Sequence, residues 1–467
     1  MTLKAFGSNG IGSNGEIEYH PDSFVFDYVY VQTTDGQTID MSPLVQEIEV
    51  RESMMSFGLS VKIVVFDNLG FLQDIKFSGS ELFTIQTTRR TQSKDYTKIQ
   101  TYYVSEVSMY ARPQTNTQVY EVSLITATTL LSTSKRVLKA YDGTREEVIT
   151  KLFNDCKSDE IRVFDERGDF FKNSEALKLN PNNKTYYEVI QDIRKLETSV
   201  GGSPLYIYET FADPTSSAMV FTCHDTLLTI EKNSLIYGPY SYSPYKSKEL
   251  DEYYRVLEVS SRLGVSNFKS IQDGHYLART SEVNVFNKEY RVDDYYLYDD
   301  RPLVYRNNAQ AGQDFPLSQG YTIGGEKLVD DIEQPFRYSL TDNPSSYYES
   351  SDDVKSLYQD VYHRYAKARS SDRMYDQVSH EIKIYGNILL RCGGAFDLKL
   401  SVPDNSATGV SDETFSGRYM VYSYVHKFSR EGFFSYVKLK RNTIRTPGGS
   451  IGVSSSDKLY DKRLIGE

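Results

Sequence analysis

Apolar and polar residues alternate through the last part of the chain, from 417 to 441. Two alternating runs, 417–428 and 433–441, are joined by Ser429-Arg430-Glu431-Gly432. A short connection that contains Gly between two such runs predicts an antiparallel hairpin. The second run predicts a half-buried strand, because residues two apart lie on the same side. Its two faces are Ser435, Val437 and Leu439 on one side, and Tyr436, Lys438 and Lys440 on the other.

The same two-residue period covers most of 24–125 and returns at 254–262 and 376–442. Clusters of Gly, Pro, Asn, Asp and Ser separate the runs, a spacing typical of antiparallel barrels. We therefore expect one β-barrel over 23–125 and a second, discontinuous one built from 251–264 and 376–442. The expected strands are 24–31, 45–51, 58–66, 82–88, 99–109, 118–125, 254–262, 380–385, 388–391, 395–401, 417–428 and 433–441, with a short helical turn at 68–72.

Between 126 and 250 the apolar period becomes that of a helix. Thr185 followed by Glu188 predicts a capping box at the start of one helix, which ends before Gly201-Gly202. Strands are expected at 205–209 and 218–223, so 126–250 is predicted to be a small α+β domain. An earlier amphipathic helix is predicted by one apolar face, formed by Val148, Ile149, Leu152, Phe153 and Cys156.

The remaining segments are polar and weakly patterned. Residues 265–375 are expected to form an inserted irregular and helical domain, with a helix that begins after Asp352-Asp353. Residues 1–22 are rich in Gly, Ser and Asn and predict a flexible arm, and 443–467 predict a flexible tail. The predicted fold class is mainly β with α+β insertions, with two similar antiparallel β-barrel domains plus inserted α+β domains.

Composition narrows the possible functions. The chain has 467 residues, too many for one hydrophobic core, so several domains are expected. Its 53 Lys+Arg against 64 Asp+Glu give a net charge of −11, which argues against a duplex-DNA binder with a dominant basic face. The 39 Tyr favour protein contact surfaces. With no apolar run of ~18 residues and no signal-peptide pattern, we expect no membrane insertion and synthesis in a reducing cytoplasm.

Candidate catalytic groups are few. Adjacent carboxylates occur at 293–294, 299–300 and 352–353, and glycoside hydrolysis needs two carboxylates that face one bond. Neighbours on a strand point apart, however, and helix capping accounts for 352–353. Cys223-His224-Asp225 combines a thiol, a base and an acid, but a nucleophile and its base normally meet through the fold rather than as neighbours. We therefore expect no catalytic residues.

Cofactor and metal motifs are equally weak. Gly10-x-Gly12-x-x-Gly15 matches a dinucleotide-binding fingerprint by letters, but almost nothing precedes it that could form the required strand. The six His are scattered without H-x-x-x-H or E-x-x-H spacing. The three Cys are far apart and are expected to be small buried apolar residues. The sequence therefore predicts no cofactor and no metal.

Four parts of the sequence resemble one protein family. These are E-I-E-V-R-E-S at 47–53 with G-L-S-V-K-I-V-V-F-D-N at 58–68; Y-Y-E-V-I at 186–190 leading through Gly202 into L-Y-I-Y at 205–208; I-Y-G-N at 384–387 with 390–396; and G-R-Y-M-V at 417–421 with the hairpin to Leu439. Together they resemble the central baseplate hub protein of contractile-tail bacteriophages, a tube-barrel family related to phage late-control proteins and to the base of type VI secretion spikes. The chain departs from that pattern in a longer 265–350 and in Cys392-Gly393-Gly394, where Gly-Asp is more usual.

The resemblance implies a structural virion protein of the tail baseplate, made in the host cytoplasm. Two similar barrels per chain would let a homotrimer close a pseudo-sixfold ring, which adapts a sixfold tail tube to a threefold central spike. The implied partners are the spike, the tail tube or tube-initiator protein and the baseplate wedge proteins. DNA would only pass through the lumen, and we hypothesise that part of the net negative charge lines it.

On this interpretation the final hairpin closes the second barrel, with a partner strand near 254–262. Its polar face then becomes a candidate subunit or partner interface, formed by Tyr422, Tyr424, Tyr436, Lys438 and Lys440. Two other classes stay open. A tail-associated cell-wall or polysaccharide hydrolase would use the Asp pairs and the Tyr-rich 290–300, and a receptor-binding tail protein would use Tyr-rich loops.

Overall fold

The computed structural model describes well over half of the chain. The described residues are 5–6, 9–11, 17–75, 77–89, 96–114, 116–156, 161–163, 177–181, 183–196, 204–211, 217–223, 227, 236–242, 252–263, 277–284, 289–296, 322–323, 326–327, 336–340, 347–349, 366–370, 372, 378–401, 412 and 415–441. None of the helices within these ranges is long and apolar enough to span a membrane.

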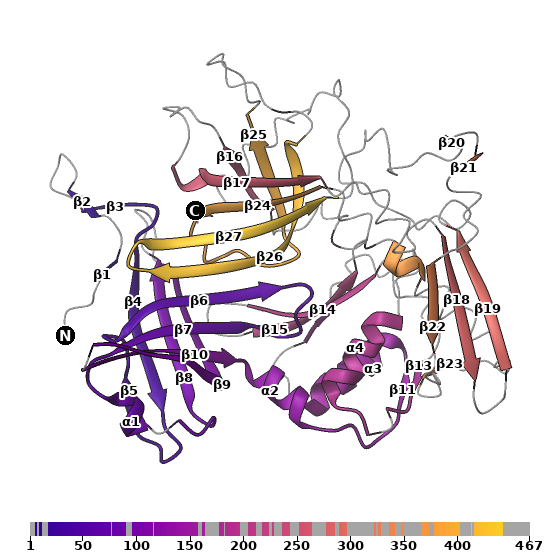
Figure 1. Ribbon diagram of the computed structural model, residues 1–467, viewed down its shortest axis with the longest axis horizontal. Helices are drawn as coiled ribbons and strands as arrows, with labels where there is room; N and C mark the ends of the chain where they lie inside the picture. The colour runs from indigo at the N-terminus through magenta and orange to yellow at the C-terminus, as the bar shows by residue number, and fades with distance from the viewer. Residues whose placement is uncertain are drawn as a thin grey trace.

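Twelve strands form the centre of a 14-stranded sheet (Figure 1). Period-two alternation produces them, since it gives each strand one apolar face. The first six are β4 (Phe24–Gln32), β6 (Val45–Ser53), β7 (Ser60–Asp67), β8 (Leu82–Arg89), β9 (Tyr96–Gln114) and β10 (Thr117–Ile125). The other six are β16 (Ile236–Tyr242), β17 (Val256–Leu263), β24 (Val378–Tyr385), β25 (Ala395–Leu400), β26 (Gly417–Ser429) and β27 (Gly432–Arg441). The prediction of a mainly β chain is confirmed.

The two sets of strands are joined edge to edge. β6 pairs antiparallel with the second half of β26, from Ser423 opposite Ser53 to Ser429 opposite Glu47. In Figure 1, β17, β24, β27, β26, β6 and β7 therefore follow one another as a single layer. Among the described strands, neither set closes on itself by a full ladder. A single bridge between Ser241 and Arg255 connects the ends of β16 and β17.

Both sets have the same topology. Numbered by their order in the chain, the strands of each set lie side by side as 1-4-5-6-3-2, which is β4-β8-β9-β10-β7-β6 in the first unit and β16-β25-β26-β27-β24-β17 in the second. Four of the five pairings are antiparallel in both units. They differ in the first pairing, because β4·β8 is antiparallel and β16·β25 is parallel.

Bulges mark equivalent places in the two units. One extra residue interrupts β6·β7 at Gln46 and β17·β24 at Leu257. Another interrupts β9·β10 at Ser105 and β26·β27 at Tyr422. Alignment on these bulges and the ladder registers matches like residues: Val45 with Val256, Glu47 with Glu258, Arg51 with Arg262, Phe83 with Phe396, Tyr102 with Tyr419, Val104 with Val421, Val122 with Val437 and Leu124 with Leu439. The chain thus contains an internal repeat.

The helices pack on a third, smaller core below the sheet in Figure 1. They are α2 (Ala127–Ser134), α3 (Arg145–Cys156) and α4 (Tyr186–Leu196), and they cover β14 (Leu205–Phe211), β15 (Ser217–Cys223) and β12 (Ile161–Val163). The predicted capping box is confirmed, since the Glu188 carboxylate accepts the Thr185 N–H at 2.7 Å and the Thr185 hydroxyl accepts the Glu188 N–H at 3.2 Å. Cys156, Cys223 and Cys392 are free and buried, as predicted.

Shorter elements complete the described chain. They are β1 (Ala5–Phe6), β2 (Asn9–Ile11), β3 (Ile17–Tyr19), β5 (Thr38–Asp40), α1 (Phe71–Ile75), β11 (Tyr141–Gly143), β13 (Leu177–Leu179), η2 (Glu252–Tyr254), β18 (Leu277–Asn284), β19 (Glu289–Tyr296), β20 (Thr322–Ile323), β21 (Glu326–Lys327), β22 (Phe336–Leu340) and β23 (Tyr347–Glu349). β2 and β3 pair within the predicted flexible arm. Of the predicted helix after Asp353, residues 354–365 lie outside the described residues, and 366–370 are helical.

Three details of the predicted strands are wrong. The final hairpin turns over two residues, not four, because Ser429 still pairs with Gly432. Residues 388–391 form turns rather than a strand, and Ile388 instead packs in the core of the first unit. β17 does not pair with the final hairpin, since β24 lies between β17 and β27.

The capping box gives a test of the helical region. Thr185→Ala should lower the free energy of unfolding by about 1 kcal/mol, because the N–H of Glu188 loses its acceptor. Thr185→Ser keeps the hydroxyl and should stay close to wild type. Urea unfolding followed by circular dichroism measures both, and equal losses in the two variants would contradict the cap.

Candidate functional site

One face of the sheet carries charged residues in cross-strand rows, and we call it the charged face. One row runs Lys62, Glu49, Lys427, Phe434 and Tyr385 across β7, β6, β26, β27 and β24. The next runs Arg51, Val425, Tyr436, Lys383 and Glu258, and a third runs Ser53, Ser423, Lys438, Glu381 and Ser260. Residues in register lie on the same side of the sheet, so basic and acidic side chains become neighbours.

Ion pairs form within and between these rows, and they include Glu121 and Glu47. The N–O distances are 2.8 Å for Lys62–Glu121, 2.7 Å for Arg51–Glu49, 2.8 Å for Lys427–Glu47, 3.0 Å for Lys383–Glu258 and 3.2 Å for Lys438–Glu381. The five basic and five acidic residues of these pairs balance in charge. The hydrogen bond from Lys383 to Glu258 raises the pKa of Lys383, and the one from Lys427 to Glu47 raises that of Lys427.

A groove of about 580 Å³ lies over the charged face, across β6, β26, β27, β24 and β17. Tyr436 lines it with a side chain that is 39% exposed. The Lys383 Nζ lies 5.7 Å from the Tyr436 ring centroid and 5.0 Å from that of Phe434. A half-exposed aromatic ring among paired charges suits contact with another protein.

The five predicted interface residues fall in three different environments. Tyr436 and Lys438 lie on the charged face. Lys440 is 6% exposed and its Nζ lies 3.6 Å from the centroid of the Tyr422 ring. Tyr424 is 1% exposed and lies in the core. The bulge at Tyr422 explains this, because one extra residue shifts the alternation by one and turns Tyr424 inward.

The core side of the same strands holds a buried acid that the sequence analysis missed. Glu52 is 1% exposed, and its carboxylate accepts bonds from the Thr210 hydroxyl at 2.8 Å, the Cys392 N–H at 2.7 Å and the Tyr424 hydroxyl at 2.7 Å. The Glu52 side chain on β6 therefore binds β14, β26 and the loop before β25 at the same time. The strand alternation could have indicated this. Glu52 lies four residues after the inward-facing Ile48, so both side chains point to the same, buried side of β6.

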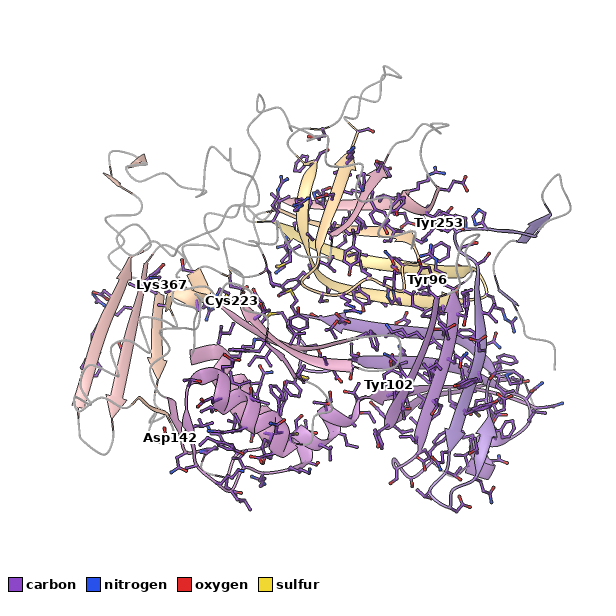
Figure 2. The ribbon with its side chains drawn as sticks, turned by 180° about the vertical axis from the view of Figure 1, so that it is seen from behind. Tyr96, Tyr102, Asp142, Cys223, Tyr253 and Lys367 are labelled. Atoms are coloured by element: carbon purple, nitrogen blue, oxygen red, sulfur yellow. The ribbon has the colours of Figure 1, made fainter. Side chains whose placement is uncertain are left out.

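Basic and aromatic groups surround this acid. Burial raises the pKa of Glu52, and burial lowers the pKa of Lys98 well below its usual value. The Lys98 Nζ lies 3.0 Å from the Phe211 ring centroid. Tyr102 lies where the first unit meets β14 and β15 (Figure 2), and burial, with Glu209 and Glu52 nearby, raises its pKa. The cluster is therefore a buried polar contact between strands and not a site that is open to solvent.

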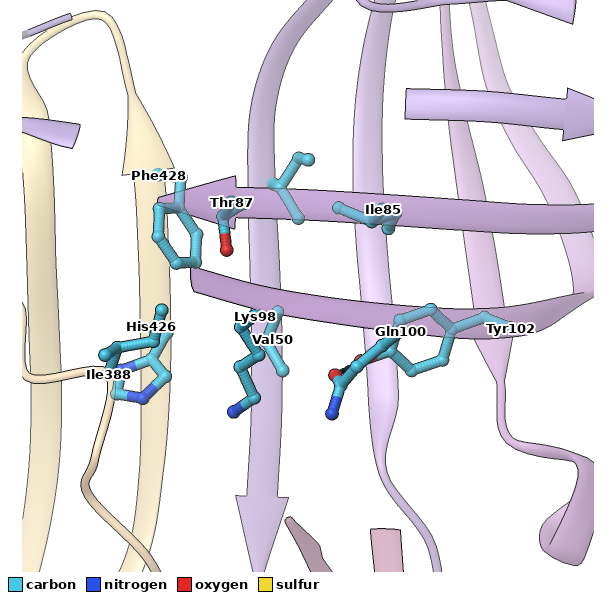
Figure 3. Close-up of a pocket in the computed structure, with 10 residues that line it drawn as sticks. Val50, Ile85, Thr87, Lys98, Gln100, Tyr102, Ile388, His426 and Phe428 are labelled. Atoms are coloured by element: carbon cyan, nitrogen blue, oxygen red, sulfur yellow. Dashed lines mark hydrogen bonds between the residues drawn. The ribbon is translucent and has the colours of Figure 1, made fainter. Parts of the chain in front are cut away.

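A small cavity lies beside Lys98 (Figure 3). Lys98 and Gln100 from β9 and His426 from β26 line the same space, which has a volume of about 20 Å³. This volume suits about one water molecule. The His426 Nδ1 lies 2.8 Å from the Ser435 hydroxyl, and its buried Nε2 has no partner among the described atoms. Burial, with Lys98 and Arg89 nearby, lowers the pKa of His426, so the ring is neutral.

The catalytic candidates do not assemble into a site within the described ranges. Asp294 is held by the Arg279 guanidinium at 2.6 and 2.8 Å, and this hydrogen bonding lowers its pKa. Cys223 is buried in the third core. Residues 224–225, 299–300 and 352–353 lie outside the described residues. No cluster of His, Cys, Asp and Glu that could hold a metal ion is found in the part of the chain that the structure describes.

The buried hydrogen bonds of Glu52 give a second test. Glu52→Ala should lower the free energy of unfolding by about 3–5 kcal/mol, because three buried donors lose their acceptor. The control is Glu49→Ala on the charged face of the same strand, where an ion pair near the surface contributes about 1 kcal/mol or less. Urea unfolding compares the two variants. Similar small losses would contradict a structural role for Glu52.

Glu209 predicts a pH dependence. Burial raises its pKa, so the folded chain keeps a proton that the unfolded chain has already released. The stability gained is present below the usual carboxyl pKa and is lost as the pH rises through the raised value. Glu209→Gln should flatten this fall in unfolding free energy with pH. Asp294→Asn is the control of opposite sign, since a lowered pKa loses stability as the pH falls.

Comparison with known proteins finds likeness in structure alone. No family model matches the chain, and no curated protein gives a significant match. A tail protein from Neisseria meningitidis is 12% identical, with 90% of this chain and 98% of that one covered and a TM-score of 0.47. The 43 kDa tail protein of prophage MuSo2 from Shewanella oneidensis is 10% identical, with 89% and 98% covered and a TM-score of 0.44. A type VI secretion component from E. coli is 9% identical, with 86% and 76% covered and a TM-score of 0.38. These three similar structures are thus two tail proteins and a type VI secretion component.

Proposed function

We propose that the chain is a structural protein of a contractile phage tail, the central hub of the baseplate. The internal repeat is the observation that carries this proposal. Two units of six strands with the same order lie in one chain, and the β6·β26 ladder fuses them into one sheet. A protein with two like units per chain can match a partner of twice its own rotational symmetry.

The proposed assembly is a homotrimer. Three chains with two like units each give six, which would adapt a sixfold tail tube to a threefold central spike. The proposed partners are that spike, the tail tube or tube-initiator protein and the wedge proteins. We retain Tyr436 and Lys438 on the charged face as proposed partner contacts, because both line the groove.

The proposed domains follow the repeat except at β16 (Ile236–Tyr242), which is the first strand of the second unit but lies within the range 126–250. They are an arm at 1–22, a first barrel at 23–125, an α+β domain at 126–250, a second barrel from 251–264 and 376–442, an insertion at 265–375 and a tail at 443–467. The β6·β26 ladder makes the two barrels one sheet rather than two independent bodies. DNA passage through the ring is supported by the balance of charge on the charged face, which offers a polyanion no dominant basic patch.

A structural role predicts assembly without hydrolysis. The purified full-length chain should have the mass of a trimer in solution and should form rings with a central channel in electron micrographs. It should clear neither peptidoglycan nor capsular polysaccharide in a plate assay. A monomer that clears either substrate would overturn the proposal in favour of a tail-associated hydrolase.

A further inference from the structure

Two strand edges have no strand partner among the described strands, although the equivalent edges in the other unit of the repeat are paired with each other. Within one chain, β6 of the first unit pairs with the second half of β26 of the second unit. By position in the repeat, β6 corresponds to β17, and β26 corresponds to β9. Among the described strands, neither the outer edge of β17 beyond Val256 nor the second half of β9 has a partner on the equivalent side.

Along one edge, β9 and β26 each pair with a first partner strand that ends partway along them. On one edge, β26 pairs with β25 over Gly417–Met420 and then with β6 over Ser423–Ser429. On the equivalent edge, β9 pairs with β8 over Tyr96–Tyr103, after which the ladder stops. Both strands contain a bulge just where the first partner ends, and β9 has two more beyond Ser108. The second half of β9 therefore has the geometry of a strand that receives a second partner.

We propose that β17 of one copy pairs antiparallel with β9, from Glu106 onward, in a second copy of this chain. The bulges fix the register. Leu257 corresponds to Gln46 and Ser105 to Tyr422. The observed pair Arg51 and Val425 then becomes Arg262 opposite Ser108. In the same register Leu263 lies opposite Val107. Two further bulges follow Ser108 in β9, so the repeat fixes the register from Glu106 to Ser108.

The residues at the two edges suit this pairing. Arg262 and Glu106 are both exposed and carry opposite charges. They become diagonal neighbours on the charged face, within reach of an ion pair. The polar pair Glu52 and Tyr424 of the internal junction is replaced by an apolar pair of residues, Leu263 and Val107. Pro113 lies further along β9, and its missing N–H ends the edge there.

The contact is between chains and runs head to tail. In Figure 1, β17 lies near the top of the molecule and β9 near the bottom, so one chain cannot pair them with each other. An edge that meets a different edge of the next copy makes a heterologous interface, which forms a ring or a filament. The repeat indicates both the partner, which is a second copy of the chain, and the strands in contact, which are β17 and β9. The closure at three chains rests on the proposed hub function.

Cysteine cross-linking of the full-length chain tests the register. Arg262→Cys with Ser108→Cys in one chain should give cross-linked oligomers on oxidation, seen on a denaturing gel without reductant. The three native Cys are buried and can be left in place. The off-register control is Glu258→Cys with Ser108→Cys, which should cross-link at least ten-fold less. Arg51→Cys with Val425→Cys is the matched positive control, because the same pair already lies in register within the chain.

Mixing distinguishes a head-to-tail contact from a symmetric one. A chain with Arg262→Cys and a chain with Ser108→Cys should give cross-linked dimers when mixed and none when alone. For the double variant, a ladder that ends at three chains supports both the contact and the hub. A ladder that continues past three supports the contact and overturns the threefold ring. A trimer by mass that does not cross-link overturns the contact alone, and a monomer that does not cross-link overturns both.

Discussion

The backbone ladder between β6 and β26 holds the molecule together, because it turns two strand units into one sheet. β6 would otherwise present a row of unpaired N–H and C=O groups. The pairing of its residues Glu47–Ser53 with Ser423–Ser429 of β26 satisfies that edge and fixes the register of every row on the charged face. The cores of the two units lie on the other side of the same strands, so the ladder also sets how Ile388 and Phe428 join the core of the first unit.

Glu52 adds chemical specificity to this backbone contact. A buried carboxylate is costly unless donors surround it, and its three donors come from β14, β26 and the loop before β25. Any other placement of the α+β part against the sheet would leave the acid without some of these bonds. The burial of this one carboxyl group thus favours one arrangement of these parts of the chain.

The sequence predicted what depends on local pattern. Period-two alternation located the strands of the first unit within a few residues, and Thr185 with Glu188 located the start of α4. It could not place Tyr424, because a bulge at Tyr422 is a single extra residue that only the pairing with β27 shows. It also could not separate β17 from the final hairpin, since strand order depends on contacts between distant segments. Glu52 was missed because an inward-facing acid shows as a site only when its donors are known.

The pairing of charges on the charged face has an electrostatic consequence. The whole chain carries −11, whereas the five basic and five acidic residues paired on this face sum to zero. Each pair is a short dipole, and the fields of opposite charges about 3 Å apart cancel well within the screening length of about 8 Å at physiological salt. From beyond that distance these five pairs contribute almost no field. The net charge of −11 therefore comes entirely from residues outside these pairs.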